Sequence, residues 1–258
     1  MGDPSAFQII PDETRVRGLQ FIGTAVAVYV VLHLVGFHRL FANDAEGVGA
    51  LLQIIGTLYS VVYAFAIYVI WGQFAAVENE IVKESGALSD LVLFSKPLKE
   101  TTREPIVRSV RAYAHGVVES EWATLSHQKS TEKTDRLFSS VISSVTEAKL
   151  EDASGGRVHE RLLEISNQAS AHRQERLAVS AKRMPRTLML FVTVTACTIP
   201  FLFLFFPFQN LALGIISIAI ATMLLFFANF VLTDLDNPFE GTWNVNSNAF
   251  NELANHCR

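Results

Sequence analysis

Three long segments of the chain, residues 18–38, 47–77 and 187–233, contain no Asp, Glu, Lys or Arg. An α-helix rises about 1.5 Å per residue, so about 20 apolar residues cross the roughly 30 Å of hydrocarbon in a bilayer. The first two segments each suit one crossing, whereas the third would extend about 70 Å as one helix and must therefore fold back. The pattern predicts an integral membrane protein.

A turn is expected inside the third segment, at Pro207-Phe208-Gln209-Asn210. Proline cannot continue a helix because it lacks a backbone N–H, and the neighbouring amides suit the depth of lipid head groups. Pro200 lies inside the helix before this turn and is expected to kink it. We therefore predict four transmembrane helices, at about residues 19–40, 49–74, 187–206 and 211–232.

Residues 75–186 show a different pattern, in which basic and acidic side chains are almost equally frequent and no long apolar run occurs. Glu104-Pro105 and Ser154-Gly155-Gly156 are expected to interrupt helices here, the second as a loop tip. The fold class is therefore all-α, with a water-facing helical domain between the second and third membrane helices. Its apolar residues recur at helical spacing in three stripes: Ile106, Val110, Tyr113, Val117; Leu137, Val141, Val145, Ala148; and Val158, Leu162, Ile165, Ala169.

The distribution of basic residues predicts the orientation of the chain, because the cytoplasmic flanks of membrane helices are enriched in Lys and Arg. Lys182, Arg183 and Arg186 precede the third helix, whereas Arg39 alone separates the first two helices. We expect a multi-pass protein of the cell membrane with a cytosolic helical domain and both termini in the cytoplasm. Its predicted segments are an N-terminal cytosolic segment (1–18), transmembrane helices 1 and 2 (19–74), the cytosolic helical domain (75–186), transmembrane helices 3 and 4 (187–232) and a cytosolic tail (233–258).

Composition excludes several other classes of protein. The net charge of −4, with no region rich in Lys and Arg, argues against binding to nucleic acid. The only cysteines, Cys197 and Cys257, allow no disulfide framework, and Cys197 is interpreted as a small apolar filler within the bilayer. The first apolar segment is long and follows a mixed-charge stretch, which favours a retained helix over a cleaved signal.

Catalytic and metal-binding patterns are poorly represented. His115 and Glu119 are four residues apart and can face each other on a helix, but a closed metal site needs three or four ligands. The chain contains no GxSxG, HExxH, Walker or GxGxxG motif. We therefore predict a protein that is not an enzyme and that uses no cofactor or bound metal.

The second predicted membrane helix has a stripe of small and polar residues. At spacings of three or four residues, one face carries Gln53, Gly56, Thr57, Ser60 and Ala64. Close helix packing explains such a stripe, because small residues let transmembrane backbones approach. Helix physics alone favours this packing explanation, and an aqueous pathway is the alternative. The absence of Asp and Glu from the predicted helices argues against a proton-coupled transporter.

The segment after the fourth helix carries a family resemblance. It reads Asp234-Leu235-Asp236-Asn237-Pro238-Phe239, followed by Thr242-Trp243-Asn244-Val245. This tail resembles the segment that follows the fourth helix of bestrophins, and it is more similar still to the family of mostly bacterial proteins described as bestrophin-like. The resemblance covers about residues 50–256. Further short motifs occur in the same order as in that family, namely Glu78-Asn79, Arg111-Ala112-Tyr113, Leu163 to Arg173 with Asn167 and His172, and Met184-Pro185.

The resemblance implies a homopentamer that conducts inorganic ions passively across the lipid bilayer along a pathway lined by the second helix. Matching Glu78-Asn79 to the bestrophin motif places three hydrophobic neck positions of bestrophins on Gly56, Ser60 and Ala64. Their side chains are far smaller than the bulky apolar groups of bestrophins. The neck is then either wider and wetter, or the constriction lies elsewhere, for instance at Ile67 or Trp71.

Calcium binding is not expected, although animal bestrophins carry an acidic run after this motif. Calcium takes six to eight oxygen ligands, and only Asp234, Asp236 and Glu240 are nearby in the sequence. The tail motif is interpreted instead as a chain reversal in which Phe239 and Trp243 pack against the cytosolic helices.

Two hypotheses for function result. The leading one is an oligomeric, bestrophin-like ion channel with its pathway along the second helix. The alternative is a non-conducting membrane scaffold whose cytosolic helices bind a partner and whose second helix packs tightly through its small residues. Water beside Gly56, Ser60 and Ala64 favours the first hypothesis, and a dry helix contact favours the second.

Overall fold

The computed structural model describes residues 11–125, 131–148 and 153–256, and these ranges contain helices and turns but no strand. The chain forms two compact units, one made of Met1–Ile70 with Met184–Asp236 and the other of Trp71–Arg183 with Asn237–Arg258. We call them the membrane unit and the helical domain. The prediction of an all-α fold is confirmed.

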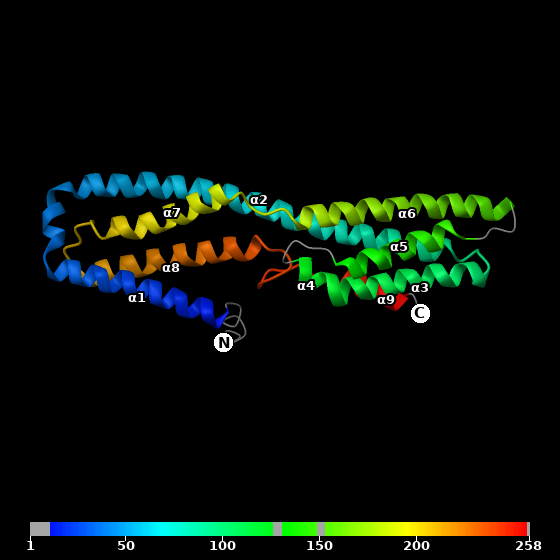
Figure 1. Ribbon diagram of the computed structural model, residues 1–258. Helices are drawn as coiled ribbons and strands as arrows, with labels where there is room; N and C mark the ends of the chain where they lie inside the picture. Colours follow the sequence, from blue (N-terminus) through cyan, green and yellow to red (C-terminus); the bar gives the residue numbers. More distant parts are fainter. Residues whose placement is uncertain (1–10, 126–130, 149–152, 257–258) are drawn as a thin grey trace, which may run out of the picture. The chain divides into compact units, whose positions relative to one another are not determined.

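Within the described ranges, four helices are long and apolar enough to cross a membrane, which confirms the predicted integral membrane protein with four spans. They include α1 (Asp12–Leu34), the first part of α2 (Ala45–Phe94), α7 (Arg186–Phe203) and α8 (Leu211–Leu235) (Figure 1). The predicted turn at 207–210 is also confirmed. Asn210 caps α8, because its side-chain oxygen accepts hydrogen bonds from the backbone N–H groups of Ala212 and Leu213. Pro200 lies within the last turn of α7.

The first span differs from its predicted bounds of 19–40, because α1 begins at Asp12 and ends at Leu34. Gly36 has a φ of 81°, a left-handed conformation that glycine adopts without a steric penalty and that commonly ends helices. A 3₁₀ helix, η2 (Phe37–Asp44), then leads into α2. Hydropathy alone did not reveal this break, since apolar residues continue past it.

The second membrane helix does not end near residue 74, where the apolar run ends. α2 continues to Phe94, well beyond its apolar part. The part of α2 after Val77 carries charged residues but keeps one apolar face. Four residues of this face are buried at helical spacing in the core of the helical domain, namely Val77, Ile81, Leu88 and Leu91. The helix therefore changes from an apolar to an amphipathic pattern without a break.

In the membrane unit, α1 and α7 both pack against α8 (Figure 1). The contact between α1 and α8 is close because it depends on glycine. The fully buried ring of Tyr29 lies over Gly214, and a Cβ atom added to Gly214 would lie 1.8 Å from the hydroxyl oxygen of Tyr29. Contacts among α2, α7 and α8 form a separate apolar cluster, whose buried members include Tyr59, Ala66, Ile70, Val192, Ala196, Ile199 and Leu232.

The helical domain is formed by the second part of α2 together with helices from two other parts of the chain. These are α3 (Glu100–Gly116), the π-helical turn η3 (Val117–Glu121), α4 (Trp122–Leu125), α5 (Glu132–Thr146), α6 (Ala153–Ser180) and α9 (Asn248–His256). All three predicted apolar stripes contribute to one core, which contains Val110, Val141 and Ile165 among others.

Two predicted helix interruptions are wrong. Pro105 lies inside α3, near its start, where proline removes a single backbone hydrogen bond. The expected loop tip at Ser154-Gly155-Gly156 falls within the first turn of α6, which begins at Ala153. First-turn N–H groups have no intrahelical partner, so this position tolerates weak helix formers.

We predict that Gly214→Ala destabilises the membrane unit by about 1–3 kcal/mol, because the new methyl group overpacks the contact with Tyr29. Thermal unfolding of the protein in detergent measures this effect. Gly23→Ala is the control, because a Cβ atom there meets nothing within 4 Å. It is expected to leave stability unchanged or to raise it by up to about 1 kcal/mol through helix propensity. Equal effects of the two substitutions would contradict the close contact.

Candidate functional site along the second membrane helix

The part of α2 in the membrane unit presents three faces. One face is buried in the apolar cluster and includes Tyr59, Ala66 and Ile70. A second face is bulky, apolar and exposed, with Ile54, Val61 and Phe65 among its members. The stripe of small and polar residues lies between these two faces, so the chain itself does not cover it.

Most of the predicted stripe residues have no covering neighbour. Gln53, Thr57, Ser60 and Ala64 are exposed, and Gly56 is half-buried. A Cβ atom added to Gly56 would meet nothing within 4 Å, so the glycine adjoins open space in the single chain. The small residues of this stripe therefore do not serve helix packing within one subunit.

The hydroxyl groups of the stripe are bonded within the helix. Thr57 Oγ1 donates to the carbonyl of Gln53 at 2.8 Å, and Ser60 Oγ donates to the carbonyl of Gly56 at 2.8 Å. Such bonds to the preceding turn satisfy a hydroxyl proton in an apolar environment. The two hydroxyls consequently need no further partner for their protons, although each keeps an acceptor lone pair for water or an ion's hydration shell.

The remaining predicted pore residues have different surroundings. Ile67 is half-buried and packs against the apolar cluster of the membrane unit. Trp71 belongs to the helical domain, is about half exposed, and contacts Phe74 and Trp243. Tyr68, which the sequence did not single out, is 77% exposed on the outward side of α2.

The tail motif holds two chain segments together. Asp236 Oδ1 accepts a hydrogen bond from the backbone N–H of Met184 at 2.7 Å, within the membrane unit. In the helical domain, Arg183 donates to Asn237 Oδ1 at 3.1 Å, and Asn237 Nδ2 donates to Glu240 at 3.1 Å. The motif thus orders the chain where it enters α7 and where it leaves α8, a role the sequence did not reveal.

The two aromatic residues of the tail motif each contact a tryptophan elsewhere in the helical domain. Phe239 is buried and lies edge-on to Trp122, with ring centroids 5.4 Å apart, and Pro238 beside it is also buried. Trp243 is half exposed and lies edge-on to Trp71, at 6.5 Å. Asp234, at the end of α8, is half-buried.

The candidate metal ligands and cysteines of the sequence have separate surroundings. In the ranges that the structure describes, no group of three or more His, Cys, Asp or Glu is placed to hold a metal ion. His115 lies in α3 and Glu119 in η3. Cys197, interpreted from the sequence as a small apolar filler within the bilayer, is exposed on the membrane unit, on a side of α7 that faces away from the apolar cluster. Cys257 lies outside the described residues.

A buried ionic network in the helical domain is the other concentration of polar chemistry. Arg176 is fully buried; its Nε donates to Glu84 at 2.5 Å and its Nη2 donates to Glu121 at 2.6 Å. Arg173 pairs with Glu121 at 3.1 Å and with Asp135 at 2.8 Å. The network joins α2, η3, α5 and α6, which are distant in the sequence.

The electrostatics of the network favour fixed charges. Burial raises the pKa of Tyr113 well above its ordinary value, and the negative charge of Glu84 raises this pKa further. Glu84 accepts a hydrogen bond from the Tyr113 hydroxyl at 2.5 Å. Burial by itself would lower the pKa of Arg176, but Glu84, Tyr113 and Glu121 raise it well above its ordinary value. These groups pair with one another and are closed off from solvent, so the network fixes the positions of the helices that it joins.

We predict that Arg176→Met destabilises the protein by about 3–5 kcal/mol, because it leaves Glu84 and Glu121 buried without their main counter-charge. Thermal unfolding in detergent measures the loss. Arg136→Met is the control, because Arg136 pairs with Glu132 on the surface, where both side chains are largely exposed. Its unfolding midpoint should hardly move, since exposed pairs contribute little. Similar losses in both variants would contradict the importance of the buried network.

Comparison with known proteins gives one family and one fold. A family model described as a Bestrophin-like domain matches residues 18–250. No curated protein sequence matches the chain.

Crystal structures of a bacterial bestrophin homologue from Klebsiella pneumoniae are similar to this chain. A leucine-to-threonine variant aligns with a TM-score of 0.72 and 11% identity, covering 93% of this chain and 97% of that chain. A tyrosine-to-alanine variant gives a TM-score of 0.73 at 12% identity, with coverage of 93% and 97%. A further structure of the homologue gives a TM-score of 0.69 at 11% identity, with coverage of 93% and 96%. At these identities the likeness concerns the fold.

Proposed function

This chain belongs to the Bestrophin-like family, and from that premise we propose that it forms an oligomeric membrane channel that conducts inorganic ions passively along α2. In this proposal five identical subunits form a closed ring in the cell membrane, with both termini and the helical domain in the cytoplasm. Gln53, Gly56, Thr57, Ser60 and Ala64 line the pathway, and Ile67 and Trp71 are candidates for its constriction.

One observation carries the proposal, namely the open space beside the small-residue stripe of α2. Four of its residues are exposed, and nothing lies within 4 Å of a Cβ atom added to Gly56. Small residues that are not used for packing within the subunit are available to line an axial path. The hydroxyls of Thr57 and Ser60 add acceptor oxygens along it.

The exposed apolar surface supports assembly. Ile54, Val61 and Phe65 are all more than half exposed beside the stripe. A ring of subunits places this face against a neighbouring subunit or lipid while the stripe faces the axis. The stated alternative, a non-conducting scaffold, places the stripe in a dry contact between subunits instead.

We predict that Ser60→Phe abolishes ion flux in liposomes while the oligomer remains assembled, because one ring per subunit then fills a neck lined by small groups. If Ser60 instead packs against another helix, the substitution overpacks that contact and costs roughly 1–3 kcal/mol of stability. Flux, thermal stability and particle mass are measured on the same preparation. Val61→Phe is the matched control, because Val61 is 64% exposed on the apolar face.

Two results would count against this assignment. Unchanged flux through a stable Ser60→Phe oligomer would remove α2 as the pore helix at this depth. A stable monomer in the mass measurement of the unsubstituted protein would remove both the ring and the axial pathway.

The proposed orientation gives a separate prediction for a protein in which Cys197 and Cys257 are replaced by serine. A cysteine at Ser140, which is exposed on α5, should be protected from an impermeant thiol reagent added outside intact cells. A cysteine at Gln209, exposed in the turn between α7 and α8, should be labelled. The reverse pattern of labelling would invert the topology.

A further inference from the structure

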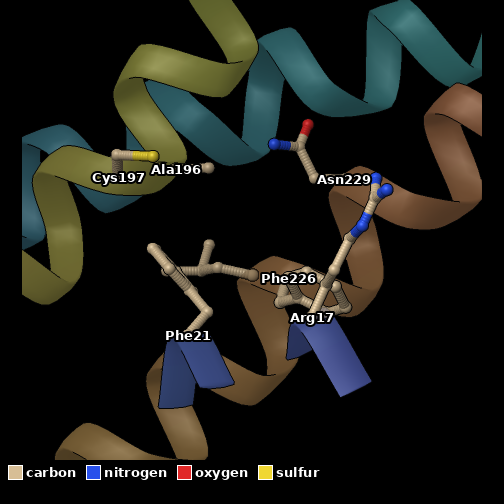
Figure 2. A pocket seen from close by; sticks show the side chains of 7 residues that line it. Arg17, Phe21, Ala196, Cys197, Phe226 and Asn229 are labelled. Carbon is tan, nitrogen blue, oxygen red and sulfur yellow. The ribbon is translucent and has the colours of Figure 1, made fainter. Parts of the chain in front are cut away.

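A cavity of about 290 Å³ lies in the membrane unit between α1 and α7, which both pack on α8. Figure 2 shows that Arg17 and Asn229 lie together at one end of it, with Phe21 and Cys197 toward the other. Ala196, Leu225 and Phe226 complete the apolar part of its wall. The cavity is therefore amphipathic, with its polar groups gathered at one end.

The charged end of the cavity is available to a ligand. Arg17 lies near the start of α1, and its side chain is 77% exposed. Its ion pair with Glu13 is long, at 3.9 Å, and Glu13 is 89% exposed. Pairs of this kind are weak, so the guanidinium remains free to bind an anion that offers paired oxygen acceptors.

Asn229, at the same end of the cavity, carries an unsatisfied acceptor. Its Oδ1 is buried and has no hydrogen-bond partner among the described residues, although Asn229 lies within a candidate membrane span. Buried polar atoms in folded proteins are normally hydrogen-bonded, so this acceptor calls for a donor. A ligand at this end of the cavity should therefore carry a hydrogen-bond donor as well as an anionic group.

The apolar part of the cavity lies deeper in the membrane than the polar end. Phe21 is one helical turn, about 6 Å, further into α1 than Arg17, and Phe226 is almost one turn further from the end of α8 than Asn229. Phe21 and Cys197 are exposed, so this part of the wall opens to the surroundings of the unit. A chain of methylene groups matches this surface.

We propose that this cavity binds one membrane phospholipid per subunit, with an anionic head group that also carries hydrogen-bond donors, such as phosphatidylglycerol. The phosphate accepts hydrogen bonds from the Arg17 guanidinium, and a head-group hydroxyl donates to Asn229 Oδ1. An acyl chain lies along Phe21, Phe226 and Cys197. This proposal does not depend on ion conduction.

The chemistry distinguishes this ligand from other lipids and from soluble anions. Phosphatidylcholine has the same phosphate but no head-group donor and no net charge. Glycerol phosphate has the anionic group and the hydroxyls but no acyl chain to occupy the apolar part. A phospholipid with both features satisfies the cation, the orphaned acceptor and the apolar wall together.

Native mass spectrometry of the delipidated oligomer tests the proposal with phosphatidylglycerol, phosphatidylcholine of identical acyl chains, and glycerol phosphate as probes. The unsubstituted protein should bind phosphatidylglycerol about fivefold more tightly than phosphatidylcholine, the effect of one basic side chain on an anionic lipid. Arg17→Gln should remove this preference, and Asn229→Leu should reduce it. Cys197→Phe should weaken binding of both lipids by filling the apolar part.

Arg186→Gln is the matched control, because Arg186 is exposed at the start of α7, outside the cavity, and its replacement removes the same charge. It should leave the preference intact, and unchanged unfolding midpoints should show that each variant is folded. Equal effects of Arg17→Gln and Arg186→Gln would indicate diffuse surface charge and overturn the site. Binding of glycerol phosphate as tight as that of the lipid would replace the lipid with a soluble anion. If the lipid-free Arg17→Gln protein changes its number of subunits, the cavity is occupied by a neighbouring subunit. That result would also overturn the proposal.

Discussion

The interior of a bilayer offers no water to polar groups, and this constraint governs the membrane unit. Helices satisfy the backbone, and many side-chain hydroxyls bond to the carbonyl one turn earlier. This pattern recurs in α1, α2 and α7, at Thr24, Thr57, Ser60, Thr195 and Thr198. Polar residues on a membrane helix therefore do not by themselves demand a partner, and the open space beside Gly56 is the stronger argument for a pathway.

The helical domain meets the same cost of burial in another way, by pairing charges. Glu84 comes from α2, Glu121 from the π-helical turn and Arg176 from α6, and all three are fully buried. Phe250 of α9 lies against the guanidinium of Arg176, with its ring centroid 5.5 Å away, and is itself fully buried. The C-terminal tail thus completes the core of the domain. Removing Arg176 leaves Glu84 without its ionic partner and Glu121 with Arg173 alone, so this one side chain constrains several helices at once.

Much of the fold follows from patterns that are local in the sequence. Charge-free runs predict the four spans, and three apolar stripes predict the core of the helical domain. The break at Gly36 was missed because it depends on a backbone conformation rather than on hydropathy. The pairing of Glu84 with Arg176 joins residues 92 positions apart, and the cavity at Arg17 combines three helices. Neither leaves a periodic signal, so only the folded chain reveals them.

The surroundings of the candidate pathway also reflect the geometry of an α-helix. A heptad falls about 20° short of two full turns, so residues seven apart drift around a straight helix. Gln53 and Ser60 are exposed, but Ile67, one heptad further, is half-buried against the apolar cluster. Ala64 remains exposed, as does Tyr68, which lies four residues further along.

In the proposed ring, the walls near Ser60 consist of small groups from the stripe itself. At the depth of Ile67 the stripe turns toward the subunit's own core, and the bulky ring of Tyr68 becomes the larger outward group. The proposed pathway can therefore narrow at that depth while α2 stays straight, because the heptad spacing of the stripe does not match the helical repeat.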